Sequence, residues 1–206
     1  GTRITVLKAH EENVGVVAFS PDGRLLLTAD STYNTVDNSA VVWSCDDLDA
    51  IEKRYEMRAH ANYVSSAAFS PDGAVLATGG NDSRILLWDA ATGSFRKELV
   101  GQKQEVHGFA FSPDGRTLVS ASGETIMGWH IATGRELIKL HLDSDAHYVA
   151  FSPDGNIVAA LAGANPYSPE ELYIWRAPSF EEIAAAEHSS PHEQSQQRGI
   201  DWGEQH

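Results

Sequence analysis

Short apolar runs alternate with compact polar turns along most of this chain. Residues 14–19 and 64–69 are apolar segments of strand length, and each is followed by a second one, at residues 25–28 and 75–78. Runs this short, rich in Val, Leu and Phe and bounded by turn residues, are typical of β-strands. The pattern therefore predicts an all-β chain built from hairpins.

The residues Ser-Pro-Asp-Gly separate the two strands of each predicted hairpin. Proline holds φ at about −65°, aspartate can bond to the backbone two residues on, and glycine adopts positive φ freely. The longer string Ala-Phe-Ser-Pro-Asp-Gly occurs four times, beginning at Ala18, Ala68, Ala110 and Ala150. These starts are 50, 42 and 40 residues apart, and one four-stranded propeller blade takes roughly 40 to 45 residues. The spacing predicts one blade per copy.

Each copy also carries a β-rich run that ends on tryptophan. The runs are Val41-Val42-Trp43, Leu86-Leu87-Trp88, Ile126-Met127-Gly128-Trp129 and Tyr173-Ile174-Trp175. Further tight turns are predicted at residues 79–82 and 91–93, so each repeat contains four strands.

With these motifs the chain resembles the WD-repeat β-propeller family over residues 1–176, and the copy from Ala59-His60 to Trp88-Asp89 is the closest to the pattern. The resemblance implies an all-β WD-type propeller of about four four-stranded antiparallel blades. The ending Trp-Arg-Ala-Pro-Ser-Phe-Glu-Glu resembles bacterial multi-repeat WD proteins. We therefore expect the C-terminal part of a bacterial-type protein.

The resemblance also implies a buried polar tetrad of His, Ser or Thr, Asp and Trp in each blade. The matching residues are His10, Thr28, Asp37 and Trp43 in the first repeat and His60, Thr78, Asp82 and Trp88 in the second. The third repeat has Gln102 in place of the histidine, and the fourth has Ala160 in place of the hydroxyl. We expect no intact tetrad in the fourth repeat, and we expect both later blades to depend more on packing.

Blade boundaries follow from the repeat. We assign residues 1–8 to the outer strand of a preceding or closing blade, 9–58 to blade 1, 59–100 to blade 2, 101–140 to blade 3, 141–178 to blade 4, 179–187 to a short helix or outer strand, and 188–206 to a disordered tail. Four blades lie at the bottom of the range of about four to eight. We expect an incomplete ring, as a fragment of a longer array or as one of two half-rings.

Composition narrows the functional classes. A net charge of −14 with only 15 Lys and Arg argues against a nucleic-acid partner, and no apolar stretch predicts a membrane span. The single cysteine, Cys45, favours a reducing, cytoplasmic location. Motifs for nucleophilic, phosphate-binding, dinucleotide-binding and zinc sites are absent from the sequence, so we expect a non-enzyme with no cofactor or metal.

Function should then lie on the loops of a rigid scaffold. In the family, the partner-binding face bears the loops that enter each innermost strand, which implies the candidates Asn13, Gly15, Tyr63, Ser65, Glu105, His107, Asp145 and His147, with Tyr33 and Tyr167 on two insertions. The leading hypothesis is a non-catalytic protein-interaction scaffold or sensor module that binds a protein or peptide. The alternatives are an enzyme or small-ligand binder acting at the central channel, and a purely structural assembly unit, including a homo-oligomer.

Overall fold

The computed structural model describes residues 5–10, 13–32, 38–48, 50–163 and 171–176. These residues form fifteen strands and no helix. The strands are β1 (Val14–Phe19), β2 (Leu25–Asp30), β3 (Ala40–Ser44), β4 (Glu52–Met57), β5 (Val64–Phe69), β6 (Val75–Gly80), β7 (Ile85–Asp89), β8 (Phe95–Leu99), β9 (Val106–Phe111), β10 (Thr117–Ser122), β11 (Thr125–His130), β12 (Glu136–His141), β13 (Ala146–Phe151), β14 (Ile157–Ala162) and β15 (Glu171–Arg176).

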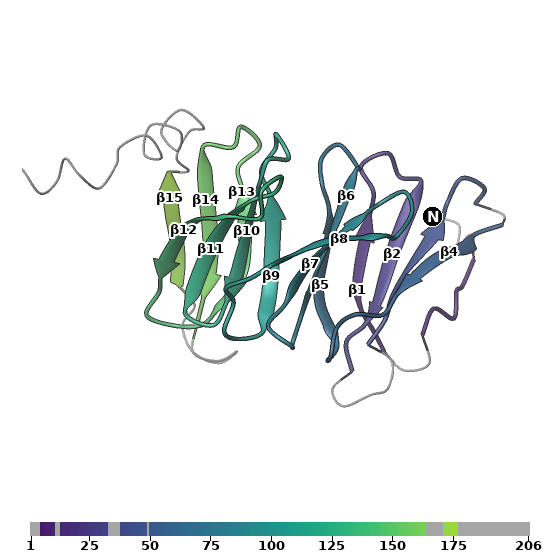
Figure 1. The fold of residues 1–206 in the computed structure, drawn as a ribbon, viewed down its shortest axis with the longest axis horizontal. Helices are drawn as coiled ribbons and strands as arrows, with labels where there is room; N and C mark the ends of the chain where they lie inside the picture. Colours follow the sequence, from purple (N-terminus) through teal and green to yellow (C-terminus); the bar gives the residue numbers. More distant parts are fainter. Residues whose placement is uncertain (1–4, 11–12, 33–37, 49, 164–170, 177–206) are drawn as a thin grey trace, which may run out of the picture.

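Four antiparallel sheets, here called blades 1 to 4, are each built from strands that follow one another in the sequence. β1–β4, β5–β8 and β9–β12 form four-stranded sheets, whereas β13–β15 form a three-stranded sheet within the described residues. The blades stand side by side in chain order, with blades 1 and 4 at opposite ends of the row (Figure 1). The predicted fold, an all-β array of propeller-type blades in an open ring, is confirmed.

The same hydrogen bonds close the turn between the first two strands of every blade. In blade 1 the Ser20 hydroxyl donates to Asp22 Oδ1 at 2.6 Å and accepts the Leu25 N–H at 2.9 Å, and Gly23 has a φ of 73°. The other three turns repeat the serine-to-aspartate bond, at Ser70–Asp72, Ser112–Asp114 and Ser152–Asp154. The bond from Ser152, with backbone and side-chain donors from Asn156, lowers the pKa of Asp154 to about 2. Each turn therefore satisfies its own polar groups, whichever blade carries it.

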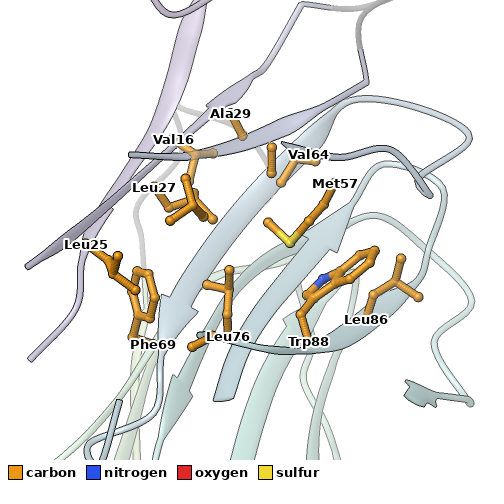
Figure 2. Packing of buried hydrophobic residues seen from close by; sticks show 13 residues of the cluster. Val16, Leu25, Leu27, Ala29, Met57, Val64, Phe69, Leu76, Leu86 and Trp88 are labelled. Carbon is orange, nitrogen blue, oxygen red and sulfur yellow. The ribbon is translucent and has the colours of Figure 1, made fainter. Parts of the chain in front are cut away.

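Apolar side chains fill the spaces between neighbouring blades. Between blades 1 and 2, Val16 and Leu27 point toward Leu76 and Trp88 (Figure 2). Blade 2 packs on blade 3 through Leu87, Leu99, Leu118 and Trp129. Blade 3 packs on blade 4 through Ile126, Leu142, Ala160 and Trp175. Burial of apolar surface is the main force that holds sheets face to face. Each inner blade is therefore held by both of its neighbours.

Outer strands reach across to the next blade as well. On β4, the Tyr55 hydroxyl donates to the Ala90 carbonyl of blade 2, and burial raises the pKa of this phenol to about 12. The Tyr55 ring lies so close to Gly93 that a Cβ at this position would clash with it. On β8, the Lys97 ammonium donates to the Ala132 carbonyl of blade 3 at 2.5 Å. Polar contacts thus repeat at the outer rim of successive blade pairs.

The ends of the chain leave three assignments as predictions. Residues 5–10 form no strand, so the outer strand expected at residues 1–8 stays a prediction. The segments expected as a helix or outer strand, 179–187, and as a tail, 188–206, lie outside the described residues.

Candidate functional site

A directional chain of hydrogen bonds runs through the interior of blade 2. The Trp88 indole N–H donates to Thr78 Oγ1 at 2.9 Å, and Thr78 Oγ1 lies 2.9 Å from His60 Nε2. His60 Nδ1 lies 2.9 Å from Asp82 Oδ1. Because a carboxylate only accepts, Nδ1 carries the proton, and the Thr78 hydroxyl donates to Nε2. We call these four residues the blade 2 relay, and every link has a donor and an acceptor.

The relay ends on a carboxylate that further donors hold in place. Burial would raise the pKa of Asp82, but the hydrogen bond from His60 and those from the backbone N–H groups of Ala61 and Arg84 outweigh it. The pKa therefore lies below its ordinary value. This network ties the loop before β5 to the turn between β6 and β7, which fixes one end of the blade.

Blade 1 contains the same inner part of the relay. The Trp43 indole N–H donates to Thr28 Oγ1 at 2.9 Å, and Thr28 Oγ1 lies 3.0 Å from His10 Nε2. His10, Thr28 and Trp43 are all buried. The fourth candidate, Asp37, lies outside the described residues.

In blade 3 an amide takes the place of the histidine. Gln102 Nε2 donates to Ser120 Oγ at 2.5 Å, and the Trp129 indole N–H donates to the same oxygen at 2.9 Å. Since both neighbours donate, the Ser120 hydroxyl directs its proton to the Met127 carbonyl at 3.3 Å. Gln102 Oε1 is buried and accepts no hydrogen bond from the described residues. Glutamine in place of histidine therefore keeps the hydrogen bonds at the centre of the network. The serine hydroxyl, however, accepts from the residue at the histidine position and donates to a backbone carbonyl instead.

Blade 4 has no hydroxyl at this position. Ala160 is buried, and His141, the nearest candidate in the sequence for the missing histidine, is exposed. Trp175 instead stacks on Tyr173, with ring centroids 5.8 Å apart and an interplanar angle of 13°. Among the described residues, packing and strand pairing support the interior of this blade.

A second polar group crosses from blade 2 to blade 3 at the entrance to the innermost strands. The Tyr63 hydroxyl, just before β5, donates to Glu105 Oε1 at 2.7 Å, just before β9. The Asn81 side-chain amide donates to Glu105 Oε2, and Asn62 donates to Asn81 Oδ1 at 2.9 Å. The Glu105 carboxylate is thus fixed by two donors from the neighbouring blade.

The same group continues into blade 4 through two imidazoles. His107 Nδ1 lies 3.9 Å from Glu105 Oε1. The rings of His107 and His147 meet edge to face, with centroids 5.4 Å apart and an interplanar angle of 61°. His147 Nε2 donates to the Gly163 carbonyl at 3.0 Å. We call Tyr63, Asn81, Glu105, His107 and His147 the inter-blade row; each is partly exposed.

The other predicted contact residues lie near the row or apart from it. The Ser65 hydroxyl turns inward to the Val106 carbonyl at 2.5 Å, and the Asp145 carbonyl accepts the Gly163 N–H at 3.0 Å. Asn13 and Gly15 belong to blade 1, where a Cβ at Gly15 would clash with the Ser31 hydroxyl.

The remaining candidates, Tyr33 and Tyr167, lie outside the described residues. Asn81 was not among the candidates, because its place in a tight turn already explained it.

Among the described residues, no three His, Cys, Asp or Glu side chains are arranged to hold a metal ion. The same part of the chain contains no helix long and apolar enough to cross a membrane.

The sequence profile of the family described as "WD domain, G-beta repeat" matches residues 1–44, 51–89 and 93–130, which is more than half of the chain. The chain belongs to the WD40 repeat family. The matched WD40 segments extend through blades 1 and 2 and most of blade 3. Blade 4, in which Ala160 replaces the hydroxyl, lies outside them.

Two curated relatives are fungal proteins. The chain is 36% identical over 74 residues to "Nuclear distribution protein PAC1" of Gibberella zeae and 35% identical over 74 residues to "Nuclear distribution protein nudF" of Aspergillus terreus. Each match covers 35% of this chain but only 16% of the relative. Both relatives are fungal, so they do not support the expected bacterial-type origin.

Proposed function

We propose that this WD40 chain is a non-catalytic protein-interaction module and that its partner contacts the inter-blade row. The observation that carries the proposal is the continuity of the row across three blades, from Tyr63 through Glu105 to His147. Binding sites concentrate on loops held by a rigid scaffold, and a site shared between blades is held by more than one sheet. Membership in the WD40 family supports the same function.

The chemistry of the row favours a partner segment with a basic side chain. Glu105 accepts hydrogen bonds from Tyr63 and Asn81, and an ionised carboxylate has about four acceptor positions, so it can take further donors. The net charge of −14 would also steer a basic segment toward the surface. Tyr63 adds an aromatic ring that can cover the aliphatic part of such a side chain.

The test replaces both ends of the row and compares partner capture. In the double variant Tyr63→Ala with His147→Ala, we expect loss of the proteins that the wild-type chain captures from its own cell extract, with an unchanged thermal unfolding midpoint. Asn156→Ala is the matched control, because this exposed residue lies on the Ser-Pro-Asp-Gly turn at the opposite end of blade 4. Capture that survives in the folded double variant would refute the assignment of the row.

The cellular setting is also part of the proposal. We propose a cytoplasmic protein, and the single cysteine Cys45, which can form no internal disulfide, supports this. Burial raises the pKa of the Cys45 thiol, which favours the unreactive protonated form. We propose neither cofactor nor catalytic residue.

A further inference from the structure

Every innermost strand contains a β-bulge at the same place, and in two blades the extra residue is a histidine. The pairing of β9 with β10 shifts by one residue at His107, and the pairing of β13 with β14 shifts at His147. A bulge takes its extra residue out of the regular alternation of the strand and can redirect the side chain. The extra residues of β1 and β5 are Gly15 and Ser65. Among the four blades, an imidazole therefore occupies this place in blades 3 and 4.

The residue after the bulge faces the blade that follows. In blade 1 it is Val16, a buried side chain between blades 1 and 2 (Figure 2). In blade 2 it is Ser66, whose buried hydroxyl lies beside Gly79 at the contact with blade 3. The equivalent residue of blade 3 is Gly108. Its φ is outside the left-handed region, so the backbone conformation at this position does not require glycine.

The backbone of β13 takes the space that a side chain at Gly108 would occupy. A Cβ at Gly108 would crowd the carbonyl oxygen of His147 and touch the Cα of Tyr148. Both are backbone atoms, which cannot rotate away as the end of a side chain can, so only a shift of the strand would relieve the crowding. Glycine within a strand often marks such a close approach of another backbone. The crowded residue, His147, is the one whose imidazole meets His107.

Two hydrogen bonds hold β13 and the His147 ring in this close position. The N–H of Ala146, the first residue of β13, donates to the Gly123 carbonyl at 2.8 Å, in the turn between β10 and β11 of blade 3. The His147 imidazole donates to the Gly163 carbonyl of its own blade at 3.0 Å. The place of the His147 ring relative to His107 therefore depends on how closely β13 lies to β9.

We infer that Gly108 is the positioning residue of the inter-blade row. Because it has no side chain, β13 can approach β9, and His147 comes into contact with His107. The consequence for binding rests on the proposed function, in which the partner contacts the row. A binding site has to be held within about 0.5 Å of its productive geometry. Valine at this position, the residue that blade 1 has there, would separate the two rings and weaken partner binding.

Nuclear Overhauser effects between imidazole ring protons measure the contact directly in the full chain. We expect a cross-peak between His107 and His147 in the wild type and its loss in Gly108→Val. Gly128→Val is the matched control, because a side chain there would crowd Ile138 within blade 3 and outside the row, so the cross-peak should remain. A cross-peak that is absent from the wild type, persists in folded Gly108→Val or is lost in folded Gly128→Val would overturn the inference.

A smaller change keeps the test decisive if Gly108→Val does not fold. Gly108→Ala places a single Cβ against the His147 carbonyl and should weaken the cross-peak. A cross-peak as strong as in the wild type would overturn the inference.

Partner capture separates this inference from the proposed function. Gly108→Val should reduce recovery of the partner from the cell extract roughly tenfold, as loss of one well-placed contact does, whereas Gly128→Val should retain it. Loss of the cross-peak with unchanged capture would support Gly108 as the positioning residue but refute the row as the partner site. Loss of capture with an unchanged cross-peak would overturn the inference, because Gly108 would then act without moving the imidazoles.

Discussion

Blades 2 and 4 share one strand register but differ in how their interiors are supported. In both, the residue six positions after the repeat phenylalanine pairs with the residue that follows the repeat tryptophan: Val75 with Asp89, and Ile157 with Arg176. Blade 2 adds the relay and the outer strand β8, whereas blade 4 has Ala160 and, within the described residues, three strands. The shared turn and strand pattern therefore suffice to form a blade. In blade 2 the polar relay also holds the loop before β5 to the turn between β6 and β7.

The largest effect should come from the apolar core that both blades need. Leu76→Ala removes a fully buried side chain between blades 1 and 2, and we expect a loss of about 2 to 5 kcal/mol in the free energy of unfolding. Val158→Ala, the counterpart in blade 4, should cost less because it removes fewer buried carbon atoms. Urea denaturation measures both, with Val100→Ala as an exposed control expected within about 0.5 kcal/mol of wild type. Equal small losses at both core sites would contradict the view of blade 2 as a tightly packed centre.

The next effect tests the relay directly. Thr78→Val keeps the shape of the side chain but leaves the Trp88 indole N–H and His60 Nε2 without their buried partner. We expect a loss of about 1 to 3 kcal/mol in the free energy of unfolding.

The reverse change in blade 4, Ala160→Thr, should give no gain, because His141 is exposed and cannot complete a relay. A clear increase in stability from Ala160→Thr would show that a hydroxyl alone is enough.

Acid should weaken blade 2 through Asp82. Its pKa is lowered in the folded chain, so the stabilisation is fully present above the ordinary value of 3.8 and is lost as pH falls through the folded value. We expect the difference in free energy of unfolding between wild type and Asp82→Asn to be largest near neutral pH. The difference should shrink as pH falls below that ordinary value. A constant difference across this range would exclude Asp82 as the titrating group.

The smallest effect should come from the ion pair between Arg84, two residues after Asp82, and Glu98 on the outer strand β8. Arg84 Nη2 lies 2.8 Å from Glu98 Oε2, and both side chains are partly exposed. The hydrogen bond from Arg84 lowers the pKa of Glu98. Glu98→Gln should cost less than about 1 kcal/mol, and less still in high salt. Thermal unfolding at two salt concentrations measures this, and a salt-independent loss would point to packing instead of charge.

Much of the fold could be predicted because its determinants are local. The Ser-Pro-Asp-Gly turn satisfies its own donors and acceptors, so it forms alike in the fully hydrogen-bonded blade 2 and in blade 4. Gln102 shows where residue type alone was insufficient. The missing histidine suggested a broken network, yet the amide donates to Ser120 and the hydroxyl turns to a backbone acceptor.

The candidate site was less predictable for a physical reason. Tyr63, Glu105 and His147 could be proposed one blade at a time from their place before or within an innermost strand. Their contacts with one another depend on the distance and angle between successive blades, which cannot be predicted from the sequence of a single repeat. Asn81 was missed because its place in a tight turn already explained it, and its contact with Glu105, 24 residues away in the next blade, also depends on how the blades pack.

The sequence by itself determined the repeat, the strands, the turns and the membership of this chain in a propeller-forming family, because each rests on residues close together in the chain. Only the tertiary structure decided which polar groups meet between blades and how blade 3 compensates for its missing histidine. Those properties arise where one sheet packs against another. Burial and hydrogen bonding there depend on the neighbour as much as on the residue itself.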